Sequence, residues 1–287
     1  MIKMSGSKTI ALIGPGAMAE AIIAGLLRQN ITTPESIFAS GPRSERVEEL
    51  QTRYGVRPFT NNRFAAQQAD VVILSIKPQR LPKVLQGLEG AIQNHALVLS
   101  IIAGATIQTI ADGLKHPAVV RSMPNTPAQI GEGITVWAAS ASVTPEQHDL
   151  ASRILSALGQ QVFVEEETYL DMATALSGTG PAYVFLFMEA LIDAGVHMGF
   201  PRRIAEQLVM QTILGSVSYY DKHKTHPAQL RNQVTSPGGT TAQALYYLEK
   251  AGFRTALSRA VWAAYERTLE LGKGLNIQPP DRDRQDM

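Results

Sequence analysis

The chain has 287 residues, 45% of them hydrophobic and 18% charged, which is enough length and apolar content for one large or two modest globular domains. Lysine and arginine number 26 against 25 aspartate and glutamate residues, a balance that disfavours nucleic acid as a partner. The absence of cysteine excludes disulfides and thiol nucleophiles. Met1–Lys8 lacks the apolar core of a signal peptide, and no apolar run approaches the roughly 20 residues of a membrane span. We therefore expect a soluble cytoplasmic protein without a membrane partner.

From Thr9 to about Val164 the sequence alternates short β-type runs with helical stretches. This alternation is typical of a parallel sheet covered by helices on both faces, so we predict the α/β fold class. A capping box at Thr144–Gln147 predicts one of the helices, through about Leu158. The predicted strands are Thr9–Ile13, Ser36–Ala39, Val71–Ile76, Leu97–Ile102, Val119–Ser122, Ile134–Trp137 and Gln161–Val164.

A G-x-G-x-x-A pattern follows the first predicted strand and precedes a helical stretch. Its first glycine permits a tight turn, its second leaves room for a pyrophosphate against the backbone, and its final alanine lets the helix approach the strand. The diphosphate would then lie on the helix N-terminus. Residues 1–164 are therefore predicted to form a Rossmann-type dinucleotide-binding domain, with the cofactor contacted by Gly14, Pro15, Gly16, Ala17, Met18 and Ala19.

The end of the second predicted strand favours NADPH over NADH. An NAD-specific site has an Asp or Glu there, which accepts hydrogen bonds from the ribose 2'-hydroxyl. Here Ser40 and Arg43 follow the strand without a carboxylate, and a hydroxyl with a guanidinium suits a 2'-phosphate. Glu45 is expected in the following helix, and Arg46 is expected to be a solvated residue of that helix. NADH remains the alternative cofactor.

Three further strand ends are candidates for the cofactor site, because the carboxyl ends of strands face the ligand in open α/β sheets. Ile76, Lys77 and Pro78 close the third run, Ala103 follows the fourth, and Asn125 follows the fifth. A cationic wall for the cofactor is a commoner role for such a lysine than catalysis.

After Glu165 the strand patterns stop, and residues 165–272 are predicted to form an all-helical domain. Its predicted helix Pro181–Met198 is apolar around most of its circumference and needs burial on several sides, which so small a domain struggles to provide. We therefore expect dimerisation through this domain, with a self-contained bundle as the alternative. Residues 273–287 are predicted to be a disordered tail.

Two glycine clusters interrupt the helical half. Leu176–Pro181 is predicted to be a turn that starts the long helix, and Gln233–Thr241 directly precedes a helix running to Lys250. Small residues and hydroxyls at a helix N-terminus form an anion cradle from backbone N–H groups, which suits a substrate carboxylate. A capping loop without a ligand is the alternative interpretation of the second cluster.

At these residues the chain resembles the pyrroline-5-carboxylate reductase family along almost its whole length. The segment Val234–Thr241 is similar to the family's diagnostic signature. Four other segments lie in the family's order, namely Ile76–Pro78, Asn125–Pro127, Leu176–Tyr183 and His226–Pro227.

The resemblance implies a reaction, in which NAD(P)H gives hydride to C5 of the cyclic imine (S)-1-pyrroline-5-carboxylate and forms L-proline in the last step of proline biosynthesis. It also implies a homodimer with interlocked helical domains, in many members built into a decamer. Carried over by position, Ser236, Gly239, Thr240 and Thr241 would hold the substrate carboxylate. Ser236 and Thr241 would be the catalytic residues, with the Thr241 hydroxyl reaching the ring nitrogen.

The resemblance also implies that Asn62, Lys77, Pro78 and Ala103 line the cofactor. Glu167 matches a position near the substrate, although its acidic run also fits a solvated helix start. Gln233 and Lys224 depart from the family pattern, in which some members carry Asn and Glu, and this leaves the contacts around the substrate ring open.

The chemistry requires no metal, because a protonated imine is already electrophilic. His223 and His226 lack a third ligand, so we predict no metal site. A β-hydroxyacid dehydrogenase is the rival enzyme, but it needs a catalytic lysine on a glycine-rich helix, and Pro181–Met198 contains none. A nicotinamide-sensing or scaffold protein is the non-catalytic rival, and it would have no use for the Ser236–Thr241 loop.

Overall fold

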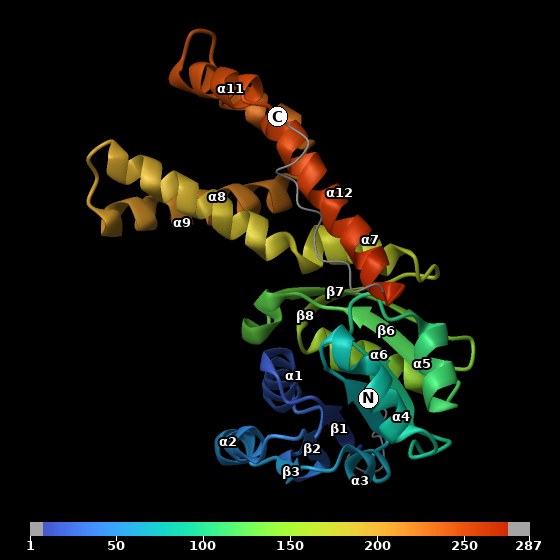
Figure 1. The fold of residues 1–287 in the computed structure, drawn as a ribbon. Helices are drawn as coiled ribbons and strands as arrows, with labels where there is room; N and C mark the ends of the chain where they lie inside the picture. Colours follow the sequence, from blue (N-terminus) through green and yellow to red (C-terminus); the bar gives the residue numbers. More distant parts are fainter. Residues whose placement is uncertain (1–7, 275–287) are drawn as a thin grey trace, which may run out of the picture. The chain divides into compact units, whose positions relative to one another are not determined.

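The computed structural model describes residues 8–274 and separates them into two compact units (Figure 1). The sheet unit comprises the residues up to Thr179 together with those from Ala264 onward, and the helical unit comprises Gly180–Ala263. The predicted disordered tail lies outside the described residues except for Lys273 and Gly274, and so does the polar N-terminal segment except for Lys8.

The sheet unit contains one eight-stranded sheet in the described part of the chain, with the order β3-β2-β1-β4-β5-β6-β7-β8. The strands are β1 Ile10–Ile13, β2 Ile37–Ser40, β3 Arg57–Phe59, β4 Val71–Leu74, β5 Leu97–Ser100, β6 Val119–Met123, β7 Gly133–Ala139 and β8 Gly159–Phe163. Seven of them were expected within a few residues. The edge strand β3 was not predicted, because it has three residues and Pro58 at its centre.

The predicted parallel sheet contains one antiparallel strand pair, because β7 runs antiparallel to β6. The connection between them contains only a short 3-10 helix at Thr126–Ile130. A parallel partner requires a crossover of roughly a dozen residues or more, usually with a helix, so this short link turns the chain back. The other strand pairs are parallel.

Apolar side chains on both faces of the sheet form two core clusters. Along β1, Ile10 and Leu12 belong to one cluster, while Ala11 and Ile13 belong to the other. This alternation is what a strand covered on both faces requires. The helices of this unit are α1 Ala17–Arg28, α2 Ser44–Tyr54, α3 Asn62–Ala66, α4 Leu81–Leu88, α5 Ile107–Leu114, α6 Pro145–Ser156 and α7 Tyr169–Ala173. The predicted capping box of α6 is confirmed, although the helix ends at Ser156.

The helical unit has almost no interior of its own. Its helices are α8 Gly180–His197, α9 Arg202–His223, α10 Pro227–Gln233, α11 Thr240–Lys250 and the first part of α12 Phe253–Gly272. Among the described residues of this unit, only Gly195 and Ala205 are buried, where α8 and α9 approach each other. Helix α12 is continuous, beginning in the helical unit and ending in the sheet unit.

One helical run corrects an expectation about membranes. Tyr169–His197, which combines α7, a π-helical segment and α8, is long and apolar enough to span a membrane by length and composition. A single helix of this kind is weak evidence, because core helices of soluble proteins pass the same test. The exposed apolar surface of Tyr169–His197 therefore needs an explanation other than a membrane span.

Candidate cofactor and substrate sites

The turn between β1 and α1 is fixed by the strands on either side of β1. Gly14 has a φ of +99°, and a Cβ there would lie 2.8 Å from the carbonyl oxygen of Ser75 after β4, so glycine is required on both counts. Its N–H donates to the carbonyl of Ser40 at the end of β2 at 2.9 Å. The Ser75 hydroxyl donates to the carbonyl oxygens of Ile13 and Gly14 at 3.1 and 2.9 Å. The turn is thus already held in one conformation.

The N-terminus of α1 offers free donors and open space together. Gly16 is the N-cap and has no side-chain capping hydrogen bond, so the first N–H groups of the helix have no capping side chain. Gly16 and Ala17 are exposed, and a Cβ on Gly16 would meet no atom within 4 Å. A diphosphate fits this combination, because the helix dipole and the N–H groups favour an anion. Ala19, in contrast, is buried, as its packing role requires.

At the end of β2, Ser40 serves a different role from the one expected. Its side chain is fully buried, and its hydroxyl donates to Asn62 Oδ1 at 2.8 Å. The hydroxyl therefore does not face solvent as a direct phosphate ligand would, and it orients the half-buried Asn62 amide instead. Arg43 is exposed, and its side chain makes no hydrogen bond or ion pair with the described residues. Its guanidinium is available to an anionic ligand.

The remaining predicted cofactor residues follow β4, β5 and β6 at the edge of the sheet where the β1 turn lies. Lys77 is exposed next to half-buried Pro78 and Ile76, and Ala103 is also half-buried. Asn125 has a structural task as well. Its Oδ1 accepts from the N–H of Ile134 at 3.0 Å, and its Nδ2 donates to the carbonyl of Ser177 at 3.2 Å. Their contacts with a cofactor stay a prediction.

Glu167 is not a solvated helix residue. Its Oε1 accepts from Arg121 Nη1 at 2.9 Å and from the N–H of Ile107, at the start of α5, at 2.8 Å. Arg121, on β6, is buried and also pairs with Asp171. A buried guanidinium must be paired, since losing one partner leaves an uncompensated charge. A charged residue inside an apolar strand, as Arg121 is in β6, indicates such a pairing. The sequence therefore contained a signal that our prediction for Glu167 did not use.

The first glycine cluster is not a turn. Thr174–Gly178 is a π-helical segment, in which the N–H of Thr179 donates to the carbonyl of Thr174 at 2.8 Å, and the chain continues directly into α8. The wider i to i+5 hydrogen bonding lets the helical run pass through the glycine cluster without a turn. Segments of this kind are frequent at functional sites.

The second glycine cluster forms an open helix N-terminus in the helical unit. Gly239 is the N-cap of α11 and has no side-chain capping bond, and its own N–H donates to the carbonyl of Ser236 at 3.0 Å. Gly238 has a φ of +69°. Ser236 and Thr240 are exposed, and Thr241 is half-buried. Residues 236–241 therefore combine uncapped backbone donors with three hydroxyls, which suits a carboxylate.

The two departures from the family pattern lie near this loop in the sequence. Gln233 is exposed at the end of α10. Lys224 ends α9 in the left-handed conformation and pairs with Asp221. Among the described residues, neither side chain forms a hydrogen bond or ion pair with Ser236 or with the first turn of α11, so a contact of Gln233 or Lys224 with the substrate stays a prediction.

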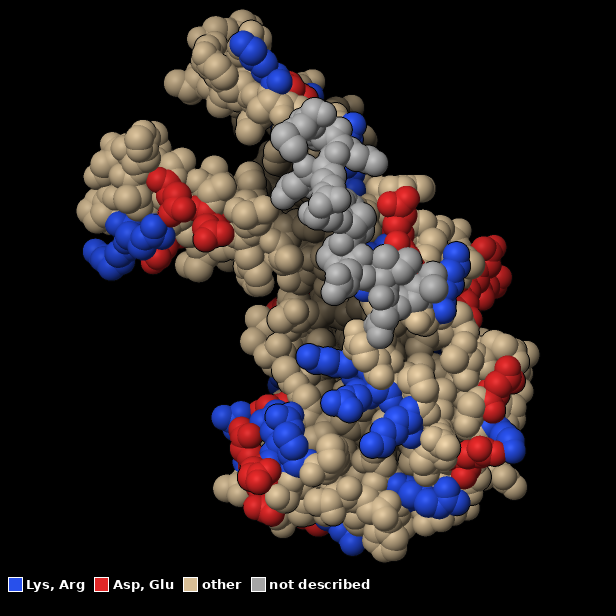
Figure 2. Space-filling view, in the orientation of Figure 1, with Lys and Arg blue, Asp and Glu red and all other residues tan. Residues whose placement is uncertain are grey.

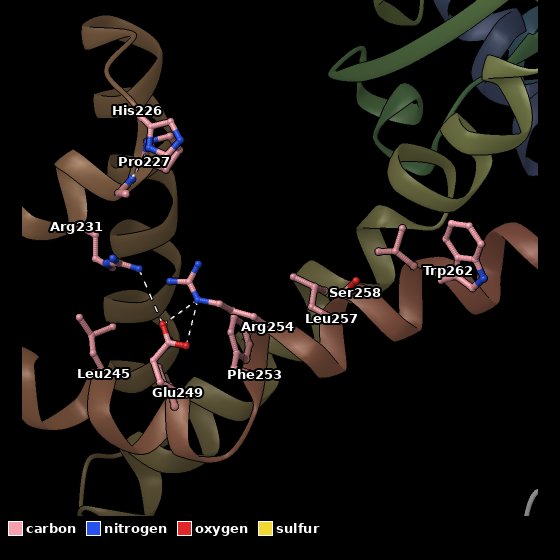
Figure 3. A pocket seen from close by; sticks show the side chains of 13 residues that line it. His226, Pro227, Arg231, Leu245, Glu249, Phe253, Arg254, Leu257, Ser258 and Trp262 are labelled. Atoms are coloured by element: carbon pink, nitrogen blue, oxygen red, sulfur yellow. Dashed lines mark hydrogen bonds and ion pairs between the residues drawn. The ribbon is translucent and has the colours of Figure 1, made fainter.

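The helical unit also carries a groove of about 790 Å³ between α10, α11 and α12. Figure 3 shows Arg231 and Arg254 directed at Glu249 from two sides of it, with N–O distances of 4.0 and 2.8 Å. Phe253, Leu257 and Trp262 provide apolar lining. On the face seen in Figure 2, charged side chains of this unit gather near the α8–α9 turn and on α11, and much of the remaining surface is uncharged. Many large apolar side chains among the described residues of this unit are exposed, including Phe185, Leu186 and Leu214.

Comparison with known proteins accounts for these features. The chain is 46% identical to the pyrroline-5-carboxylate reductase of Synechocystis sp., over 92% of this chain and 98% of that protein. It is 40% identical to the enzyme of that name from Methanosarcina acetivorans, over 93% and 99%. The chain belongs to the pyrroline-5-carboxylate reductase family. Its fold is similar to the crystal structure of Plasmodium falciparum pyrroline carboxylate reductase with NADP bound. The TM-score is 0.86 at 33% identity, and the match covers 92% of this chain and 98% of that one.

Two family models divide the reductase chain between them. Residues 9–104 match the model described as NADP oxidoreductase coenzyme F420-dependent, and residues 167–271 match the model described as pyrroline-5-carboxylate reductase dimerisation. The predicted Rossmann-type domain, helical dimerisation domain and oxidoreductase activity of this family are thereby confirmed. The reductase uses a nicotinamide cofactor, and its helical region is a domain of self-association, which explains the uncovered faces of α8 and α9.

Proposed function

We propose that this chain reduces (S)-1-pyrroline-5-carboxylate to L-proline with NADPH, in the last step of proline biosynthesis in the cytoplasm. The observation that carries the proposal is the uncapped N-terminus of α11 with the hydroxyls of Ser236, Thr240 and Thr241, in a chain 46% identical to a pyrroline-5-carboxylate reductase. A second uncapped helix N-terminus, at Gly16, provides the donors for the cofactor diphosphate.

The substrate carboxylate would accept hydrogen bonds from the first N–H groups of α11 and from the Ser236 and Thr240 hydroxyls. Gly239 allows this approach, because a Cβ there would lie only 3.1 Å from Ser236 Oγ and crowd the loop. The Thr241 hydroxyl, half-buried one residue further along, would accept from the protonated ring nitrogen. That contact holds the ring in place while the nitrogen changes from an iminium to an amine.

The cofactor, when bound, supplies the hydride that C5 of the ring receives. The nitrogen lone pair forms as the C=N double bond becomes single, so no further acid is needed once the imine is protonated. The protein's task is therefore to bind and orient two small partners. Backbone donors at two helix N-termini, together with Asn62 and Lys77 on the cofactor side, suit that task.

The preference for NADPH rests on Arg43 and Asn62. Ser40 fixes Asn62 Oδ1, which leaves the two amide hydrogens of Asn62 for an acceptor, and the exposed Arg43 guanidinium has no competing partner among the described residues. We expect Arg43→Ala to raise the KM for NADPH about 10-fold and to leave the KM for NADH unchanged, because NADH lacks the 2'-phosphate. Equal effects on both cofactors would remove this assignment.

A homodimer is the minimal assembly that we propose, and a decamer is the larger assembly that the family resemblance implies. Support comes from exposed large apolar side chains on the helical unit, including Phe185, Leu186, Leu214, Tyr247 and Trp262. Sedimentation velocity of the purified protein distinguishes monomer, dimer and decamer. A monomer at every concentration tested would contradict the assembly.

Turnover by the purified chain is the deciding experiment. NADPH and synthetic pyrroline-5-carboxylate are incubated with the protein, loss of NADPH absorbance is followed, and proline is identified by mass spectrometry. The expected result is one proline formed for each NADPH oxidised. A Ser236→Ala, Thr241→Ala double variant serves as the control for non-enzymatic reduction. Absence of turnover with NADPH and NADH over a broad pH range would overturn the proposal.

A further inference from the structure

Arg46, on α2, reaches back to the cofactor turn. Its Nε donates to the carbonyl oxygen of Pro15 at 2.9 Å, and only 19% of its side chain is exposed. This corrects the expectation of a solvated helix residue. Pro15 is itself buried and lies between Gly14 and Gly16, next to the free N–H groups at the start of α1.

Both terminal nitrogens of the Arg46 guanidinium also donate to carboxylates. Its Nη2 donates to Glu20 in the first turn of α1, and its Nη1 donates to Glu49 at 2.7 Å. Glu20 also accepts from Arg53 and from the Tyr54 hydroxyl. Two carboxylates compensate the guanidinium charge, so Arg46 differs from Arg43. The Arg46 guanidinium is already paired and is therefore not an unpaired cation available to a phosphate.

The peptide between Pro15 and Gly16 would be weakly held without this contact. The N–H of Gly16 donates to the carbonyl of Gly14 at 2.8 Å, which closes a three-residue turn around Pro15, a geometry less favourable than a helix or ladder bond. Glycine at position 16 also permits rotation of the peptide. A rotated Pro15 carbonyl would present its partial negative charge to an incoming diphosphate.

We propose that Arg46 is a positioning residue that keeps the Pro15 carbonyl directed into the protein, and thereby keeps the β1–α1 turn in the form that accepts a dinucleotide diphosphate. The diphosphate is common to NADPH and NADH. Arg46 therefore sets affinity for both cofactors, whereas the proposed contact of Arg43 sets the choice between them. Glu20 orients Arg46, but the bond to Pro15 comes from Arg46 alone.

The test is equilibrium binding of NADPH and of NADH to the purified protein by isothermal titration calorimetry, without substrate and without turnover. Arg46→Met should raise both dissociation constants by the same factor, about 10- to 100-fold, as expected for one lost hydrogen bond from a charged group. Arg46→Lys should raise both as well, because an ammonium lacks the planar fork that serves Pro15, Glu20 and Glu49 together.

Arg53→Met is the matched control. Arg53 also pairs with Glu20, but it has no bond to the turn, so this variant should leave both dissociation constants at the wild-type values. Thermal unfolding of each variant reports any general loss of stability. A rise confined to NADPH would show instead that Arg46 contacts the 2'-phosphate. Unchanged affinities in Arg46→Met, or equal losses in Arg53→Met, would show a merely structural role, and if Arg46→Met does not fold, Arg46→Lys carries the same test.

Discussion

Leucine side chains have opposite surroundings in the two units of this reductase. In the sheet unit, Leu99 and Leu155 are fully buried between the sheet and its helices, whereas Leu186 and Leu214 in the helical unit are 66% and 58% exposed. The sheet unit thus completes a core by itself, on both faces of one sheet. The described residues of the helical unit leave many large apolar side chains exposed, as expected of a domain of self-association.

Polar groups show the same contrast. Arg121 is buried in the sheet unit and paired with Glu167 and Asp171, whereas Arg231, Glu249 and Arg254 of the helical unit meet at the exposed groove of Figure 3. The β1–α1 turn is held by strand ends of a completed core, while the proposed carboxylate site at Ser236–Thr241 lies on helices with few buried residues. Substrate binding is therefore expected to be more sensitive to assembly than cofactor binding.

The largest effect is expected from a charge placed on the uncovered surface. Leu186→Asp should convert the dimer to a monomer and raise its dissociation constant at least about 1000-fold, because an unpaired carboxylate would be buried at the interface. Light scattering after gel filtration measures the change. Ile130→Asp is the matched control, since Ile130 is 74% exposed on the sheet unit and should leave the assembly intact. Dissociation by both variants would contradict the comparison.

Two leucine truncations should differ in their dependence on protein concentration. Leu99→Ala should lower the free energy of unfolding by about 2–5 kcal/mol at every concentration, because it leaves a cavity in a closed core. Leu214→Ala should lower the free energy of unfolding by less than Leu99→Ala does. Its effect should depend on protein concentration, with a Tm that rises as the concentration increases, as expected where folding is linked to association. Calorimetric scans at several concentrations check both results, and an equal, concentration-independent loss would oppose the proposed difference.

Thr241→Ala tests whether the helical unit acts on the substrate and not on the cofactor. The hydroxyl is expected to bind the charged ring nitrogen. Its loss should therefore lower kcat/KM for pyrroline-5-carboxylate by a factor equivalent to about 1–3 kcal/mol of transition-state stabilisation. The dissociation constant of NADPH should stay unchanged. Steady-state kinetics and calorimetry measure the two quantities. Wild-type kcat/KM would remove the assigned role, and Thr241→Ser, which keeps the hydroxyl, should restore most of the activity.

The smallest effect concerns His116 in the sheet unit. Burial lowers the pKa of His116 below its ordinary value of 6.5, although its ring Nε2 lies 2.8 Å from the carbonyl of Ala96, which acts in the opposite direction. A depressed pKa means that the unfolded chain takes up the proton first. The contribution of His116 to the free energy of unfolding is therefore fully present above pH 6.5 and decreases as the pH falls below that value.

Between pH 7 and pH 5, we expect the Tm of His116→Gln to decrease by about 1–3 °C less than the Tm of the wild type, because glutamine can donate to the carbonyl of Ala96 without titrating. Thermal scans of the variant and the wild type over that range measure it. Parallel curves for the two proteins would show that another group is responsible.

Periodicity and motifs predicted most of the fold, because continuous apolar runs such as Val71–Leu74 have few structural alternatives. The antiparallel β7 was also within reach of the sequence, since the chain between β6 and β7 is too short for a helical crossover. The edge strand β3 was not, because Arg57 and Pro58 have no strand pattern and pair only once β2 is in place. The π-helical Thr174–Gly178 was not predicted, because its serine and glycine are equally typical of a turn.

Local motifs predicted the two uncapped helix N-termini of the candidate site, whose ligand contacts stay predictions, but not the hydrogen-bond partner of every side chain. The uncapped helix starts at Gly16 and Gly239 follow directly from glycine placement. Ser40 was expected to face a phosphate and instead orients Asn62, and Arg46 was expected to face water and instead holds Pro15. In both cases the partner lies more than twenty residues away, so the contact depends on how strands and helices pack.

The path of α12 has a consequence for the order in which the molecule is made. A Cβ on Gly104 would lie 2.7 Å from the backbone nitrogen of Gly272 and 2.9 Å from the carbonyl oxygen of Thr268, so the end of α12 closes tightly over the loop that follows β5. During synthesis this last piece of the sheet unit emerges only after Gly180–Ala263. The loop beside Ala103 is therefore completed last, and a nascent chain cannot finish its cofactor domain before its association domain has been translated.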